Sequence, residues 1–309
     1  MTGYEYTLTN RVGQSVKFND FTTDPDNFIA LQDYPVFDVD VKNQEIDREG
    51  QHGIWDFFSF YGKRVITFSG VIIGESEGDV ETLKRQLLQV ISLPSQPSAE
   101  NDGMVLIQWT DANGSDWQIY AKLERPIRFD RPLKRNLQLG FVITMKAPSP
   151  EIESQEVITN EGMRGWQTGS LRLSTLLPAK INLIWQNAEI ATNNGTVEAH
   201  TIIRLHGEAG GVANPRIYNF TTGKTFQVNM NLADQTKWIE IDSKAGTVVD
   251  QDGNDQSGNV DPMSEYVLLA IGDNELVYLS DESSGADSPV NTWKYPAAEF
   301  SVAHRSTIL

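Results

Sequence analysis

Short apolar stretches separated by Gly, Asn and Asp recur along the whole chain, and this pattern predicts a protein built mostly of β-strands. In the first half, strands are expected over 104–110, 116–123 and 137–147, with a hairpin turn at 111–115. In the second half, similar runs recur at the spacing of an antiparallel sandwich. The predicted fold class is therefore mainly β.

The stretch WDFFSFYGKRVITFSGVII, residues 55–73, holds five aromatic residues within its first seven positions. It predicts two strands, Trp55–Tyr61 and Arg64–Ile73, joined by a tight turn at Gly62. His52 lies just before it between two glycines, and no partner for a general base is recognisable nearby. We therefore interpret this region as a contact surface for another protein rather than as a reactive pocket.

One helix is predicted over 79–91, because Val80, Leu83, Leu87, Leu88 and Ile91 have helical spacing. Asp79 is expected to cap its start, and the helix is expected to stop before residue 94, which is a proline. No second long helical pattern occurs in the sequence. The helix therefore belongs to a β-rich N-terminal domain.

A domain boundary is expected near residue 150, where Pro148 and Pro150 directly follow a predicted strand. The chain has 309 residues, which suits two domains of roughly 150 residues each. We predict an N-terminal domain over 1–150, a β-sandwich or split barrel with one helix. A C-terminal antiparallel β-sandwich is predicted over 151–309.

The net charge of −17 argues against a protein that binds nucleic acid or an anionic membrane surface. The chain has no cysteine, which excludes disulfides, thiolate nucleophiles and cysteine-ligated metals. No signal peptide or transmembrane run is recognisable, so we expect folding in a cytoplasm. A basic run over 122–135 is the local exception to the negative charge, and we expect it to face an acidic surface of another subunit.

Candidate chemistry is sparse. The run His206–Gly211 is glycine-rich like an esterase oxyanion loop, but the nucleophile elbow that must accompany it is missing. Oxygens at Asp250–Asp255 are available to calcium, although the spacing departs from the EF-hand pattern, so calcium binding there stays open. We predict no catalytic residue, no cofactor and no metal site. Four tryptophans of the second half are candidates for stacking on sugars, with core packing as the other reading: Trp166, Trp185, Trp238 and Trp293.

Several short patterns follow one another in order along both halves of the chain. In the first half they are Asp47-Arg48, His52-Gly53, the aromatic strand, Tyr61–Arg64, Gly70–Gly74, the helix and a strand closing at 141–150. In the second half they are Gly207–Pro215, Ile217–Gly223, Trp238–Asp242 and a late hairpin around Ile271–Asn274. This succession resembles the distal tail proteins of bacteriophages with long, non-contractile tails. The late turn departs from the proline-glycine-x-asparagine common in that family.

The resemblance implies a non-enzymatic structural protein of the virion. Its N-terminal domain is expected to form a hexameric ring that continues the tail tube, and its C-terminal domain a peripheral galectin-like sandwich. The implied partners are the tail tube protein, the tail-tip hub and receptor-binding proteins, while DNA passes through the channel without specific binding. The implied location is the tail tip of the virion, after synthesis in the cytoplasm of the host bacterium.

Our hypothesis is that the aromatic region divides its side chains, Phe58 included, between the domain core and the ring interface. The expected interface residues are His52, Trp55, Phe57, Phe60, Tyr61 and Arg64. The alternative function is that of a carbohydrate-binding β-sandwich module that recognises glycans of the host surface.

Overall fold

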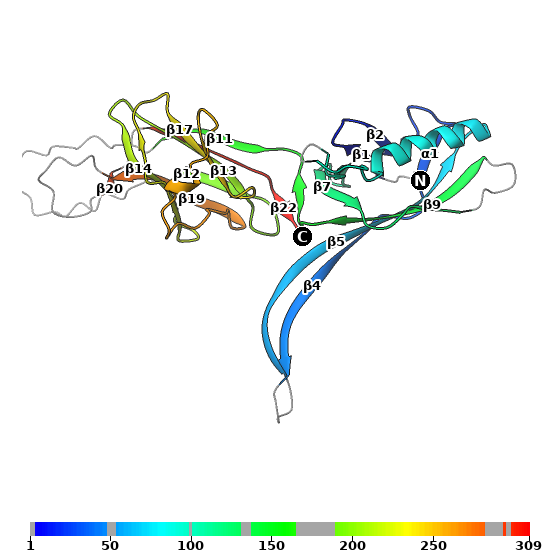
Figure 1. Cartoon of the computed structure of the whole chain (residues 1–309), viewed down its shortest axis with the longest axis horizontal. Helices are drawn as coiled ribbons and strands as arrows, with labels where there is room; N and C mark the ends of the chain where they lie inside the picture. The colour runs from blue at the N-terminus through cyan, green and yellow to red at the C-terminus, as the bar shows by residue number, and fades with distance from the viewer. Residues whose placement is uncertain are drawn as a thin grey trace, which may run out of the picture. The chain divides into compact units, whose positions relative to one another are not determined.

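The computed structural model of the chain describes residues 4–47, 54–98, 101–130, 137–164, 189–281, 293–294 and 298–309, with the backbone alone at 44–47, 54–57, 164 and 293–294. The chain divides into two compact units, Met1–Gln155 together with Leu309, and Glu156–Ile308. Figure 1 shows strands in both units and a helix in the first. The predicted mainly β fold class is confirmed.

Unit 1 is built around one long, curled sheet. Its strands are β1 (Tyr6–Asn10), β2 (Ser15–Phe18), β3 (Phe28–Leu31), β4 (Val36–Asp47), β5 (Ile54–Ile73), β6 (Val105–Thr110), β7 (Asp116–Leu123), β8 (Arg128–Phe129), β9 (Gln138–Ala147) and β10 (Ile152–Ser154). The order across the sheet is β2-β1-β6-β7-β9-β5-β3, with β4 paired to β5, β8 to β9 and β10 to β7. The three strands predicted between residues 104 and 147 are confirmed as β6, β7 and β9.

The two ends of this sheet meet, so that unit 1 is a nearly closed barrel. The backbone N–H of Asn19, just after β2, donates to the carbonyl of Ile29 in β3 at 2.8 Å. The side-chain oxygen of Asn19 accepts from the N–H of Leu31, also at 2.8 Å. The interior is filled by large apolar side chains that are almost fully buried, namely Leu8, Phe18, Ile66, Phe68, Ile107, Phe141, Ile143 and Met145.

Helix α1 (Glu77–Ile91) packs against β1, β2 and β5 with Val80, Leu87, Val90 and Ile91 buried. The helix is confirmed, but its expected cap is wrong. Ser76 is the N-cap: its hydroxyl accepts from the N–H of Asp79, and the Asp79 carboxylate accepts from the N–H of Ser76. This reciprocal box starts the helix two residues earlier than predicted. Among the described residues, no helix has the length and apolarity needed to cross a membrane.

The tight turn expected at Gly62 is wrong. Residues 54–73 form one continuous strand, β5, whose partner β4 runs past Gly62 on both sides. The pairs Val39–Arg64 and Val41–Tyr61 enclose two steps on β4 but three on β5, so a β-bulge lies where the turn was expected. A Cβ at Gly62 would lie only 3.0 Å from the Cβ of Asp40, so glycine permits the close approach of the strands.

Unit 2 is a sandwich of two antiparallel sheets. Its elements are β11 (Ile158–Arg164), β12 (Glu189–Asn193), β13 (Thr201–His206), β14 (Val212–Asn219), β15 (Lys224–Gln227), β16 (Asn231–Leu232), β17 (Trp238–Asp242), β18 (Thr247–Asp250), the 3-10 helix η1 (Ser257–Asn259), β19 (Gly272–Asp281), β20 (Trp293–Lys294), β21 (Glu299–His304) and β22 (Thr307–Ile308). One sheet has the order β11-β21-β13-β17-β18, and the other β12-β19-β14-β15 with β16 and β20 attached.

A single core cluster joins the two sheets of unit 2. Ile203, Leu205 and Phe300 come from the first sheet, and Ile217 and Tyr278 from the second. All five are almost fully buried, and the rings of Tyr278 and Phe300 meet at 6.0 Å between centroids. This arrangement agrees with the predicted sandwich, whereas the galectin-like detail stays a prediction.

Candidate functional site

Strands β4 and β5 extend beyond the barrel of unit 1 as a curved two-stranded ribbon (Figure 1). Pairing between β5 and β9 ends at Arg64–Ala147, and the two prolines at 148 and 150 follow the end of β9. Between Ile54 and Lys63, β5 pairs with β4 alone among the described residues. We call the ribbon formed by residues 41–47 and 54–61 the arm.

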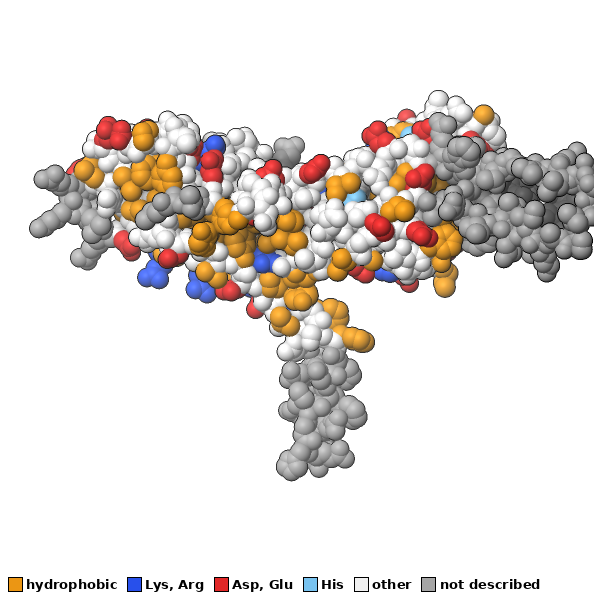
Figure 2. Space-filling model, turned by 180° about the vertical axis from the view of Figure 1, so that it is seen from behind, with side chains coloured by type: hydrophobic (Ala, Val, Ile, Leu, Met, Phe, Trp, Pro, Cys, Tyr) orange, Lys and Arg blue, Asp and Glu red, His pale blue; other side chains and the backbone are white. Residues whose placement is uncertain are grey.

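The arm presents exposed apolar side chains on both faces. Val41 and Tyr61 are paired directly, so they share one face, and they are 56% and 60% exposed. Phe60 is paired with Lys42 on the opposite face and is 55% exposed. Phe58 is 75% exposed and lies at a β-bulge between the pairs Asn43–Ser59 and Glu45–Asp56. Figure 2 shows hydrophobic side chains gathered where the arm joins the body of unit 1.

The edges of the arm add a second feature. A two-stranded ribbon carries N–H and C=O groups on its outer edges that point away from the paired strand. Within the described residues, β9 covers the β5 edge only as far as Arg64. A strand of another chain that continued along this edge would pair with β5. Open edges and two apolar faces together make the arm a surface suited to protein contact.

The structure brings some of the predicted interface residues together and removes another from the surface. Phe60 and Tyr61 are exposed on the arm. The backbone of Trp55 pairs with that of Ile46 on the arm. The side chains of Trp55 and Phe57, and the whole of His52, lie outside the described part of the chain. Arg64 is only 3% exposed, so its side chain is not available to a partner.

Arg64 instead braces the base of the arm. Its Nε donates to the carbonyl of Pro150 at 2.6 Å, and Nη1 donates to the carbonyl of Phe37 at 3.3 Å. Nη2 is buried without a hydrogen-bond partner among the described residues, and burial lowers the pKa of the guanidinium. The side chain thus links β4, β5 and the segment that follows β9.

Sequence reasoning missed two exposed apolar residues of β4, Val36 and Val41, which are 52% and 56% exposed. A signal for this strand was present, because PVFDVDV alternates apolar residues with Asp38 and Asp40. The alternation predicts a strand but does not show that its apolar side is left uncovered.

In the Asp250–Asp255 turn, the Asp250 carboxylate accepts hydrogen bonds from nearby residues of the same segment. The Asp250 carboxylate accepts from the backbone N–H groups of Asp252 and Asn254, and from the side-chain amides of Asn254 and Gln256. These hydrogen bonds lower the pKa of Asp250, and the one donated by the Asn254 side chain has the largest effect. In the described part of the chain, no group of three or more acidic or histidine side chains is arranged to hold a metal ion.

Among the tryptophans considered for sugar stacking, Trp238 is the one whose side chain is described. The Arg204 guanidinium lies over its ring at 4.3 Å from the centroid and bonds to the Glu240 carboxylate at 2.6 Å. One face of the indole is therefore covered by a cation. Trp166 and Trp185 lie outside the described residues, and Trp293 is described by its backbone alone.

Comparison with known proteins finds similarity to phage tail proteins. Residues 194–294 match the family model of the siphovirus-type tail component, C-terminal domain. The SPP1 Dit (gp 19.1) protein, described as a paradigm of the hub adsorption apparatus in phages infecting Gram-positive bacteria, has a similar structure. The TM-score is 0.64 at 11% identity, covering 98% of this chain and 99% of that one.

Chains of the phage p2 baseplate in its activated conformation are also similar. With Ca the TM-score is 0.47 at 12% identity, covering 98% of each chain. With Sr it is 0.45 at 11% identity, covering 97% of this chain and 98% of that one. No curated protein sequence matches the chain at a significant level.

The shared fold and the matched C-terminal domain define a structural component of a bacteriophage tail. Within this class, residues 194–294 are similar to the C-terminal domain of the siphovirus-type tail component, and the whole chain has the fold of the SPP1 Dit protein. The resemblance predicted from the order of short sequence patterns is thereby confirmed.

Proposed function

We propose that the chain assembles into a hexameric ring through unit 1, and that this ring links the tail tube to the tail-tip hub. The observation that carries the proposal is the arm, with exposed apolar side chains on both faces and open strand edges. A monomer gains nothing from leaving four large apolar side chains in water. Burial against neighbouring copies supplies the missing contact.

The two-sided character of the arm favours a ring over a simple dimer. In a two-fold dimer the same patch on both subunits meets itself, which covers one face. Head-to-tail contacts use two different surfaces of each subunit, and they close into a ring when the rotation permits. Val41 and Tyr61 would then contact one neighbour, and Phe58 and Phe60 another. The number six comes from the family resemblance.

The charge of the chain suits passage of DNA without binding. The net charge is −17, and Asp38 and Asp40 are exposed on β4 beside the arm. Carboxylates that line a channel repel phosphate groups, so DNA slides through instead of adhering. We assign the acidic surface this role in a central channel.

The remaining assignments follow from the family. We propose that the protein has no catalytic activity, that it contacts the tail tube protein and the hub, and that receptor-binding proteins attach outside the ring. Unit 1 takes the ring-forming role and unit 2 the peripheral one. Synthesis in the host cytoplasm and assembly at the virion tail tip complete the proposal.

Light scattering after size exclusion, combined with negative-stain imaging of the same fraction, tests the ring. The expected result is a mass six times that of the chain and particles with an open centre. A chain that stays monomeric at its highest soluble concentration, or that forms closed dimers, would contradict the proposal.

A further inference from the structure

Basic side chains gather on the outer face of the sheet in unit 1. Lys122 on β7 and Lys146 on β9 are a register pair, and Lys146 is paired on its other side with Val65 of β5. The preceding residue of β9, Met145, is fully buried, so the alternation along the strand places Lys146 outside the barrel. Lys63 lies two residues from Val65 along β5 and shares this outer face.

One carboxylate, that of Glu124, lies among these cations and accepts a hydrogen bond from Lys63. This hydrogen bond lowers the pKa of Glu124 most, and the charges of Arg125 and Lys146 lower it further, so both cations lie near the carboxylate. In the described part of unit 1, Lys122, Arg125 and Lys146 form no ion pair. We call Lys63, Lys122, Arg125 and Lys146 the basic strip.

The basic strip is costly for a single chain. Like charges that lie directly opposite each other on neighbouring strands repel, as Lys122 and Lys146 do. The chain carries 42 acidic and 25 basic residues, so a surface with an excess of cations is an exception on it. Positive charge that the chain does not neutralise is suited to contact with an anionic surface.

The same row of the sheet ends at an acidic edge strand. Asp38 of β4 is paired with Val65, so Asp38, Val65, Lys146 and Lys122 follow one another on one face. Asp38 and Asp40 are exposed, and β4 pairs with β5 alone among the described strands. Asp38 and Lys122 are three strands apart, about 14 Å, which is too far for an ion pair within one chain.

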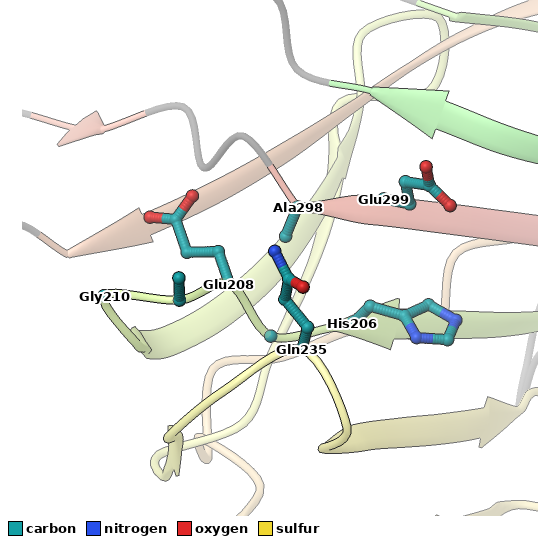
Figure 3. Close-up of a pocket in the computed structure, with 8 residues that line it drawn as sticks. His206, Glu208, Gly210, Gln235, Ala298 and Glu299 are labelled. Atoms are coloured by element: carbon teal, nitrogen blue, oxygen red, sulfur yellow. The ribbon is translucent and has the colours of Figure 1, made fainter.

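A second pair of carboxylates, in unit 2, is less suited to meet the basic strip. Glu208 and Glu299 line a polar pocket, as Figure 3 shows, and are half-buried there. Both already interact with other groups of their own chain. Asp38 and Asp40 instead lie exposed on an edge strand, where the surface of another molecule can reach them.

We propose, on the basis of the ring assembly proposed above, that the basic strip of one copy binds Asp38 and Asp40 on β4 of the next copy. The two surfaces lie at different edges of one sheet, and a head-to-tail contact requires two such different surfaces on each subunit. Complementary charge fixes the order and orientation of the copies, while the arm supplies the apolar contact.

This pairing also has a consequence for DNA. A ring with uncovered basic strips offers several cations from each copy to the phosphates of DNA. Asp38 and Asp40 of the neighbouring copy neutralise these cations. The two aspartates therefore keep DNA from adhering by cancelling positive charge as well as by repelling phosphates.

The test is sedimentation velocity of the full chain and of charge-reversal variants over a range of protein concentrations. Lys122→Glu combined with Lys146→Glu reverses the strip, and Asp38→Lys combined with Asp40→Lys reverses the edge. A further variant carries all four changes. The lysine reversal leaves a like-charged cross-strand pair in place, so the unfolding midpoint of the dilute chain should not change.

The matched control is Lys224→Glu combined with Lys237→Glu, which reverses two lysines of unit 2 that are half-buried like Lys122 and Lys146. It makes the same change in net charge outside the strip. This control should form rings as the unchanged chain does.

Each two-residue reversal, of the strip or of the edge, should raise the concentration needed for ring formation about tenfold or more, because like charges then face each other across the contact. The variant with all four changes should form rings at nearly the concentration of the unchanged chain, because the contact is again complementary.

Two results would overturn this inference while leaving the ring itself in place. One is ring formation by the lysine reversal at the concentration of the unchanged chain, and the other is failure of the four-residue variant to restore rings. If the lysine reversal keeps its rings but loses binding to duplex DNA that the unchanged chain shows, the occupant of the strip is DNA. An unchanged chain that forms no ring would overturn both this inference and the proposed function.

Discussion

The two halves of strand β5 place similar side chains in opposite environments. In the barrel, Ile66, Phe68 and Ile72 are fully buried between β9, β3 and the rest of the core. In the arm, Phe58 and Phe60 are 75% and 55% exposed on the same strand. Burying a Phe side chain contributes about 1.5–3 kcal/mol, and within the single chain the arm does not realise it. An apolar stretch of sequence thus indicates side chains suited to burial, but it does not indicate whether the same chain or another one buries them.

The largest effect is expected from Phe68→Ala in the barrel half. The Phe68 ring packs edge-on against Tyr6 at 5.8 Å and Phe18 at 5.5 Å between centroids. The substitution leaves a cavity and should lower the free energy of unfolding by about 3–5 kcal/mol. Chemical denaturation of the full chain measures it. A loss below about 1 kcal/mol would mean that this half of β5 is not core.

The junction between the halves is tested by Arg64→Ala. The change removes the donors to the partly buried carbonyls of Pro150 and Phe37, and the loss of these hydrogen bonds costs about 1–3 kcal/mol. We expect a loss of that size in the same denaturation assay. An unchanged unfolding free energy would show that Arg64 does not brace the arm.

A smaller effect is expected from the ion pair between Lys63, two residues beyond the arm on β5, and Glu124. The hydrogen bond from Lys63 lowers the pKa of Glu124. The pair therefore stabilises the fold above the ordinary glutamate pKa of about 4.3 and loses this effect as the pH falls through the lowered value.

Lys63 is well exposed, so the contribution of this pair should stay below about 1 kcal/mol. Thermal unfolding of the unchanged chain and of Glu124→Gln should differ at neutral pH and converge in acid. A difference that grows as the pH falls would contradict the assignment.

The smallest effect on stability is expected in the arm itself. Phe58→Ser combined with Phe60→Ser removes two exposed rings and should change the unfolding free energy of the dilute monomer by no more than about 0.5 kcal/mol. Denaturation at low protein concentration measures this change. Destabilisation comparable to that of Phe68→Ala would show that these rings are covered within the chain.

Local sequence patterns were enough to predict much of the fold. The helix was predictable because its apolar positions repeat at helical spacing. Its first turn was not, because Ser76 is the N-cap and Asp79 is the third helical residue of the same capping box. The tight turn predicted at Gly62 is wrong because glycine occurs both at turns and where two strands approach closely. At Gly62 the close approach is to Asp40 on β4.

The site was predictable only in part. The concentration of aromatic residues at 55–61 predicts a contact surface, and Phe58, Phe60 and Tyr61 are exposed, whereas their contact with another chain stays a prediction. The burial of Arg64 was not predictable, because its acceptors lie 86 and 27 residues away in the sequence. The pocket of unit 2 likewise depends on three separate segments that meet only in the folded chain.

The most direct test of the central claim is sedimentation velocity of three proteins: the unchanged chain, the Phe58→Ser/Phe60→Ser variant, and Leu93→Ser. Leu93 is 53% exposed and lies outside the arm, so it is a matched control for loss of apolar surface. We predict rings for the unchanged chain and for Leu93→Ser, and folded monomers for the arm variant. Rings of unchanged mass in the arm variant would contradict the claim that the arm holds the assembly together.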